Sequence, residues 1–244
     1  MQNQYDPRTR TTGMNPAATV GVPRAARDAG LRSYMLSVYN YMASGVLLTG
    51  IVALLFATSG LAEQVLSTPL RWLIMLAPLG FVMAMSFGLN RMSTGTLQTL
   101  FWSFAVAMGL SMSSIFLVYT GVSIAQTFFA VTAGFLALSL YGYTTKKDLS
   151  GFGTFLIMGV VGLLIAMLIN LFLQSPAMHM AISAIGVLLF AGLTAYDTQK
   201  IKSMYAHVAG TDMMGKVVIM GALNLYLDFI NMFTFLLSFM GNRE

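Results

Sequence analysis

The sequence contains no cysteine, which excludes a disulfide framework, a thiolate nucleophile and any cysteine-based metal site. Its two histidines, His179 and His207, are too few for a dedicated zinc or copper centre. Charged residues make up only 9% of the 244 residues, against about a quarter in a soluble domain. Hydrophobic residues make up 57%, so a water-soluble globule would lack the polar surface to cover its exterior. A soluble enzyme and a disordered chain are therefore excluded, and the composition indicates a polytopic membrane protein.

Long uncharged stretches predict seven membrane-spanning helices, because a helix needs about 20 apolar residues to cross the hydrocarbon region. Barrel strands would alternate every second residue over about ten residues, whereas these runs are continuously apolar. The glycines at 159 and 162 would let neighbouring helices approach closely. We therefore expect an all-α polytopic membrane protein. Its predicted spans are 34–58, 72–90, two within 92–145 around a turn near Thr120 and Gly121, two within 149–196 broken at Gln174, Ser175 and Pro176, and 217–242.

The distribution of basic residues predicts the orientation of these spans. With the N-terminus inside, eleven Lys and Arg residues lie on the cytoplasmic side and only Arg71 lies in an outer connection. This bias accounts for the net charge of +5 without a nucleic-acid partner. We expect residues 1–33 to form a flexible cytoplasmic tail and residues 34–244 to form the transmembrane domain. The eleven inside residues are Arg8, Arg10, Arg24, Arg27, Arg32, Arg91, Lys146, Lys147, Lys200, Lys202 and Lys216.

One acidic residue, Asp228, stands in the middle of a predicted span. It lies about 18 Å into the last segment, counted from Lys216 at 1.5 Å per residue. Asn224 and Asn231 share its helix face, so this helix carries a polar stripe. A charge at this depth costs at least about 2.5–3.5 kcal/mol, and a polar stripe must face protein or water rather than lipid. We therefore expect the last helix to be central in the bundle and Asp228 to be functional.

A second aspartate, Asp197, ends the sixth predicted span. It is either an interfacial helix-end carboxylate paired with Lys200 or a partner of Asp228 across a helical hairpin. Two carboxylates in contact at a poorly solvated site cannot both stay ionised, so they share a proton and titrate as a pair. The shared-proton form and the separated, charged form would then be two states of one bundle that pH switches.

The residues around both aspartates resemble the transmembrane Bax inhibitor motif family, in its bacterial form. Ala195-Tyr196-Asp197 and the string GALNLYLDFINMF at 221–233 match the family's C-terminal signature. The resemblance implies six helices packed around a central C-terminal helix and a pH-sensitive calcium leak gated by Asp197 and Asp228. It also implies that Arg91 is the family's arginine, which forms a salt bridge with the two aspartates in the closed state. The alternative role of Arg91 is that of an interfacial charge that sets topology.

Four further polar residues, Asn224, Asn231, Tyr196 and Tyr226, are expected to line the pore or flank the two acids. Calcium binds oxygen ligands, usually several carboxylates, and few are available within the bundle. We therefore expect Asp197 and Asp228 to contact Ca²⁺ transiently as a permeant ion, with no tightly bound cofactor.

Two classes of function remain after an enzyme is set aside. The first is a pH-sensitive calcium leak channel, and the alternative is a regulatory membrane protein that binds other membrane proteins, such as a membrane protease. Intramembrane aspartyl proteases place their second aspartate in Gly-x-Gly-Asp, whereas here it follows Tyr226-Leu227. A rhomboid-type Gly-x-Ser-Gly is absent, and no lysine lies within 217–242 to hold retinal. We therefore expect a non-enzymatic, multi-pass protein of the bacterial inner membrane whose partners are the lipid bilayer, Ca²⁺ and protons.

Overall fold

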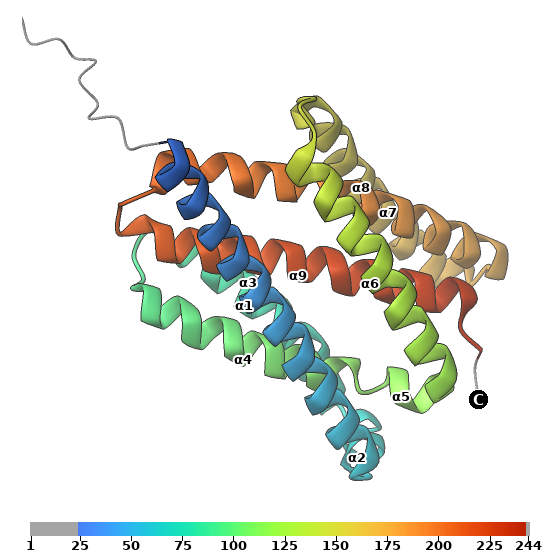
Figure 1. Cartoon of the computed structure of the whole chain (residues 1–244). Helices are drawn as coiled ribbons and strands as arrows, with labels where there is room; N and C mark the ends of the chain where they lie inside the picture. The colour runs from blue at the N-terminus through green and yellow to red at the C-terminus, as the bar shows by residue number, and fades with distance from the viewer. Residues whose placement is uncertain (1–23, 243–244) are drawn as a thin grey trace, which may run out of the picture.

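The computed structural model describes residues 24–242, and every regular element in this part of the chain is a helix (Figure 1). The described helices are, in chain order, α1 (Arg24–Thr58), α2 (Leu61–Leu66), α3 (Leu70–Gly88), α4 (Thr94–Met112), α5 (Ile115–Val118), α6 (Gly121–Thr144), α7 (Ser150–Leu173), α8 (Pro176–Val208) and α9 (Met213–Met240).

Seven segments of the described chain are long and apolar enough to cross a bilayer, as the sequence predicts. The short helix α2 lies in the connection between α1 and α3, and α5 extends the third span to Val118. The predicted break between α7 and α8 is confirmed, because Gln174 adopts a left-handed φ of 49° and ends α7. The side chain of Ser175 then caps α8 by accepting a hydrogen bond from the Met178 amide, and Pro176 occupies the first helical turn.

Two helices extend further than the sequence analysis predicted. Because α1 begins at Arg24, residues 24–33 are helical, and the prediction of a flexible tail is wrong for this part. Residues 1–23 of that predicted tail lie outside the described residues. Helix α8 continues to Val208, and Gly210 follows with a φ of +75°. Charged residues mark where a helix leaves the hydrocarbon region, but Lys and Arg are good helix formers and do not end it.

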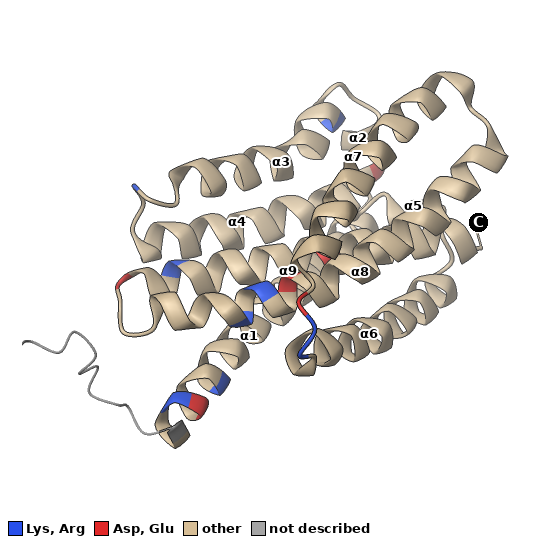
Figure 2. Cartoon of the chain, turned by 90° about the horizontal axis from the view of Figure 1, so that it is seen from above, with Lys and Arg blue, Asp and Glu red and all other residues tan. Residues whose placement is uncertain are grey.

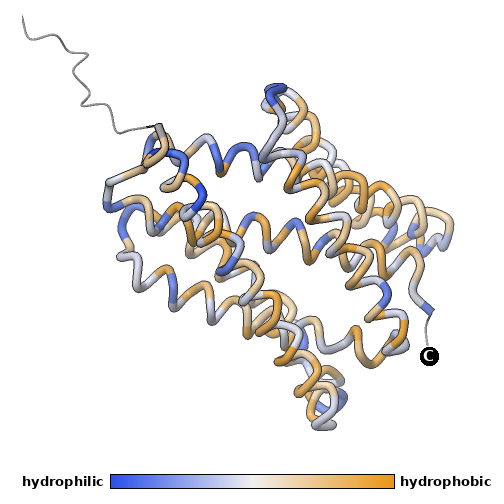
Figure 3. The backbone as a smooth tube through the Cα atoms, viewed as in Figure 1, coloured by the Kyte–Doolittle hydropathy of each residue, from blue (hydrophilic) through white to orange (hydrophobic). Residues whose placement is uncertain are grey.

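The C-terminal helix α9 forms the core of the bundle, as expected. Figure 1 shows α9 crossing the middle of the molecule, where it packs against α1, α4, α6 and α8. In its most apolar stretch 72% of the residues are buried, against 33% or less in each other spanning helix. Helix α3 packs on α4 and α7 packs on α8, so both lie further out. Figure 3 shows hydrophilic segments within this central helix, whereas hydrophobic colour dominates the outer helices.

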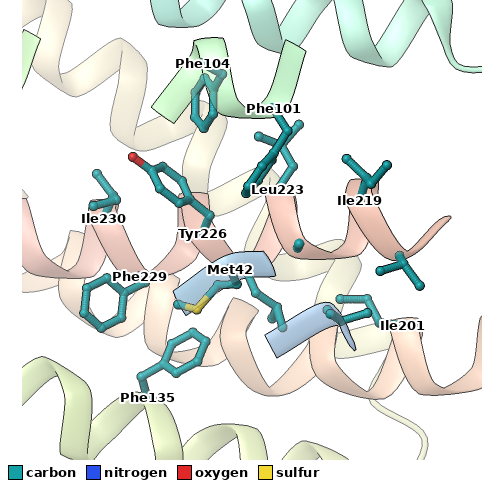
Figure 4. Close-up of a cluster of buried hydrophobic side chains, with 14 of the residues drawn as sticks. Met42, Phe101, Phe104, Phe135, Ile201, Ile219, Leu223, Tyr226, Phe229 and Ile230 are labelled. Carbon is teal, nitrogen blue, oxygen red and sulfur yellow. The ribbon is translucent and has the colours of Figure 1, made fainter. Parts of the chain in front are cut away.

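An aromatic cluster (Figure 4) and two hydrogen bonds join α9 to α1 and α4. The fully buried ring of Tyr226 packs edge-on against Phe104 and Phe101, with centroid distances of 5.0 and 6.4 Å. The hydroxyl oxygens of Tyr226 and Thr49 lie 2.6 Å apart, and Thr49 donates to the Ala105 carbonyl at 2.8 Å. Because Thr49 has a single hydroxyl proton, Tyr226 is the donor to Thr49. These bonds hold three helices together in a solvent that offers no competing partner.

Candidate functional site: an aspartate pair between α8 and α9

Helices α8 and α9 form an antiparallel hairpin that brings the two aspartates together. A Cβ atom placed on Gly221 of α9 would lie 3.3 Å from Ile201 of α8, and Phe235 packs against Gly186 further along. This register places Asp197 and Asp228 within about one helical turn, ~5 Å, of each other along the helix axes. Their carboxylates are close enough to repel each other when both are charged.

Asp228 is the enclosed member of the pair. Its side chain is only 4% exposed, and its Oδ2 atom has no hydrogen-bond partner among the described residues. Neither α4 nor α6 carries a charged residue, and the part of α1 that follows Arg32 carries none either. The electrostatic surroundings of Asp228 are therefore set by α8.

Asp197 is the partly solvated member of the pair. It is half-buried and lies well inside α8, which continues to Val208, so it is not a helix-end carboxylate. Lys200, one turn further on, attracts the Asp197 carboxylate. The Lys200 Nζ atom also lies 5.8 Å from the centroid of the Tyr196 ring. The pair thus combines one acid that water can reach with one that protein encloses.

The two tyrosines near the acids in the sequence point away from them. The ring of Tyr196 packs against Gly153 of α7. Tyr226 faces α1 and α4, on the side of α9 opposite Asp228, because residues two apart on a helix are separated by about 200°. Both tyrosines therefore pack helix interfaces in this structure and do not flank the acid pair.

The polar stripe of α9 leads into a polar cavity. Asn224 is half-buried on the face that carries Asp228. Asn231 donates its Nδ2 hydrogen to the Leu227 carbonyl at 2.8 Å and lines a cavity of about 480 Å³ between α7, α8 and α9. The cavity reaches the end of the bundle where α7 joins α8. Its polar lining consists of Asn170, Gln174, His179, Ser183, Asn231, Thr234 and Ser238.

This cavity was missed by the sequence analysis, although a signal for it was present. Thr234 and Ser238 continue the spacing of three to four residues set by Asp228 and Asn231. His179 and Ser183 are likewise four residues apart, on one face of α8. Extending the polar stripe beyond Asn231 would have predicted a polar track toward this end of the bundle.

Arg91 lies away from the aspartates in this structure. It is exposed in the turn between α3 and α4, where its amide donates to the Gly88 carbonyl at 2.9 Å. Lys216 at the start of α9 donates to the neighbouring Leu89 carbonyl at 3.4 Å. The turn therefore lies beside the start of α9, ~18 Å along the axis from Asp228. The contact of Arg91 with the pair stays a prediction for another state of the bundle.

Oxygen ligands at the pair are few. Within residues 24–242, no group of three His, Asp or Glu side chains gathers as a metal site would require. The two carboxylates at this place are those of Asp197 and Asp228, whereas tight calcium sites use six to eight oxygen ligands.

The chain is similar to known proteins over most of its length. A family model described as "Inhibitor of apoptosis-promoting Bax1" matches residues 31–244. The chain is 50% identical to an uncharacterized protein of Rickettsia prowazekii, over 89% of this chain and 92% of that protein. It is 48% identical to the inner membrane protein YbhL of Escherichia coli K12, over 88% of this chain and 94% of that protein. The seven spans, the central C-terminal helix and these matches confirm the resemblance seen in the sequence, and the chain belongs to the Bax inhibitor family of multi-pass membrane proteins.

Proposed function

We propose that the protein is a pH-sensitive calcium leak channel gated by a proton that Asp197 and Asp228 share. The observation that carries this proposal is the enclosed Asp228 carboxylate, whose Oδ2 atom has no partner and whose nearest charged neighbour of like sign is Asp197. Two adjacent carboxylates cannot both stay ionised where water is excluded. One shared proton removes the repulsion and supplies a short, charge-assisted hydrogen bond.

In this structure a polar cavity lies on one side of Asp228 and an apolar contact between α8 and α9 lies on the other. The 480 Å³ polar cavity at Asn231 leads from the end of the bundle toward Asp228. On the other side of Asp228, Ile201 packs against Gly221 and is only 1% exposed. Loss of the shared proton leaves two negative charges, which Lys200 on α8 offsets only in part. The repulsion then separates α8 from α9, so calcium flux rises as pH rises.

The proposed orientation places the N-terminus on the cytoplasmic side of a bacterial inner membrane. Figure 2 shows that most Lys and Arg residues gather where α1 begins and α8 meets α9, the end that the positive-inside rule assigns to the cytoplasm. The similar protein YbhL carries the name inner membrane protein. Because the chain has no cysteine, single Thr68→Cys and Ser150→Cys variants test the orientation. An impermeant thiol reagent should label residue 68 from outside and residue 150 from inside, and the reverse pattern would overturn it.

Calcium-dye flux into liposomes that contain only the purified protein tests the channel. Wild-type flux should rise with pH, whereas Asp197→Asn and Asp228→Asn should each give a low flux that does not respond to pH. Asp148→Asn is the matched control, since Asp148 is exposed in the loop between α6 and α7. Hydrogen bonds from the side chain and backbone of Ser150 lower the pKa of Asp148, so it stays ionised across neutral pH. This control should keep the wild-type profile.

Two results would contradict the proposal in different ways. Flux no greater than in empty liposomes would remove the channel and favour the alternative, a regulatory protein that binds other membrane proteins such as a protease. A pH-dependent flux that survives Asp228→Asn would keep the channel and remove the aspartate gate. The proposal gives neither aspartate a catalytic step, because only half of the aspartyl protease motif is present.

A further inference from the structure

An apolar groove runs along the outside of the bundle between α1 and α6. Both helices pack against α9, and Figures 1 and 2 show them next to each other on the same side of it. Three cavities of about 320, 460 and 420 Å³ follow one another along this line. The first two share Val46 and Phe229, and the last two share Tyr39 and Leu136. They form one continuous depression, the α1–α6 groove, with Phe229 of α9 in its floor.

The groove opens toward the lipid and its walls are apolar. Leu47 on the α1 side and Leu136 on the α6 side are 65% and 60% exposed and form parts of its rims. Small residues of α1 make it deep. Ala43 lines the middle cavity, and a Cβ atom placed on Gly50 would contact nothing within 4 Å. The groove therefore has the shape and surface that suit a hydrocarbon chain.

One end of the α1–α6 groove is basic. Arg32 and Tyr143 line the last cavity together. Lys202 of α8 lies 4.8 Å from the centroid of the Tyr143 ring and donates to the Tyr143 carbonyl at 2.6 Å. Beside this end, Arg27, Asp28 and Lys202 line a polar cavity of about 330 Å³. Three cations against one carboxylate leave this end positive at the level where the uncharged part of α1 begins.

We propose that the α1–α6 groove binds one anionic phospholipid, with an acyl chain along α1 and the phosphate at Arg32 and Lys202. Ala43 lies ~16 Å from Arg32 along α1, about half the 30 Å thickness of the hydrocarbon core and so within reach of one leaflet's acyl chains. A second transmembrane helix would pack against the apolar walls of the groove equally well, but it would leave the basic end without a partner. A phosphate would neutralise this positive end, as anionic lipid headgroups do when they bind basic pockets between helices. This site does not depend on the proposed channel function.

Lipid retention by the purified protein tests the site directly. The protein is taken up from nanodiscs with equal amounts of phosphatidylglycerol and phosphatidylcholine, washed in detergent and analysed by native mass spectrometry. Wild type should retain one phosphatidylglycerol in preference to phosphatidylcholine. Arg32→Gln should lower that preference about fivefold, the effect expected for one interfacial cation. Arg71→Gln, at the opposite end of the bundle, should leave it unchanged. Arg32 is exposed, so its removal leaves the helical packing intact.

A second pair of variants tests the acyl chain. Ala43→Phe fills the groove and should abolish retention of either lipid, whereas Ala84→Phe, at an exposed position of α3, should retain phosphatidylglycerol as wild type does. Equal retention of both lipids that Arg32→Gln does not change would overturn the proposal and reduce the groove to ordinary bilayer contact. Disulfide-linked dimers of an Ala43→Cys variant in the membrane would also overturn it, because a second copy would then occupy the groove.

Discussion

In soluble proteins the most hydrophobic helices are usually the most buried, and helices α7 and α9 show the reverse. Helix α7 has the highest mean hydropathy of the spans, 2.7, yet only 11% of its most apolar stretch is buried. Helix α9 has the lowest, 1.5, and is 72% buried. The bilayer is as apolar as a leucine side chain, so hydrophobicity does not decide which helix lies inside. Polar groups such as Asp228 and Asn231 decide it, because they avoid lipid by facing other helices.

The largest effect should distinguish a glycine at a helix contact from one that faces lipid. Any Cβ atom on Gly142 of α6 would collide with the backbone carbonyl of Ala195 on α8. Gly142→Ala should therefore force the helices apart and destabilise the protein by about 3 kcal/mol. A Cβ atom on Gly162 of α7 would contact nothing within 4 Å, so the close helix approach predicted at this glycine is wrong. Gly162→Ala should therefore stabilise its helix by roughly 0.5–1 kcal/mol. Thermal unfolding in detergent measures both, and equal shifts would contradict the contrast.

A smaller effect should separate buried leucines from lipid-facing ones. Leu225 of α9 is 0% exposed and Leu164 of α7 is 54% exposed. Truncating Leu225 to alanine removes packing contacts but little hydrophobic transfer energy, so we expect a loss of about 2 kcal/mol, the low end for buried leucines. Leu164→Ala should change stability by less than about 0.5 kcal/mol. A larger loss at position 164 would mean that α7 is packed in the membrane against something else.

The smallest effect concerns hydroxyl groups on the two kinds of helix surface. Thr49→Val leaves the Tyr226 hydroxyl buried without its acceptor, and we expect a loss of about 1 kcal/mol. Thr154 of α7 is exposed and its hydroxyl bonds only to its own helix, so Thr154→Val should be neutral. If Tyr226→Phe restores stability to the Thr49→Val variant, the unpaired hydroxyl is the cause.

Much of the fold was predictable because the lipid bilayer imposes a length on each apolar run. The seven spans, the break at Gln174 and the central position of α9 all follow from where charges and polar residues stand. The positions of charged and polar residues did not predict the start of α1 at Arg24 or the end of α8 at Val208. Helices continue into water without a hydropathy signal, so only caps and turns such as Gly210 mark their ends.

The candidate site was predictable only along single helices. The depth of Asp228 and its stripe with Asn231 could be counted from the sequence. Across helices, the pairing of Asp197 with Asp228 was one of two alternatives, and the family resemblance favoured it. Nothing in the sequence indicated that Tyr226 points at Thr49 or that Tyr196 packs against Gly153. Those directions depend on the rotation of each helix about its axis, which packing decides.

The central claim, that Asp197 and Asp228 form one titrating unit, is tested most directly by infrared titration of the two carboxyl groups. Wild-type protein in lipid should show the carbonyl band of a protonated carboxyl group at neutral pH, and Asp197→Asn and Asp228→Asn should each change its titration. The pH dependence of calcium flux in the double variant should differ little from that in either single one, since residues that act as a unit are not additive. A neutral-pH band that Asp197→Asn leaves unchanged, or no such band in wild type, would contradict the account.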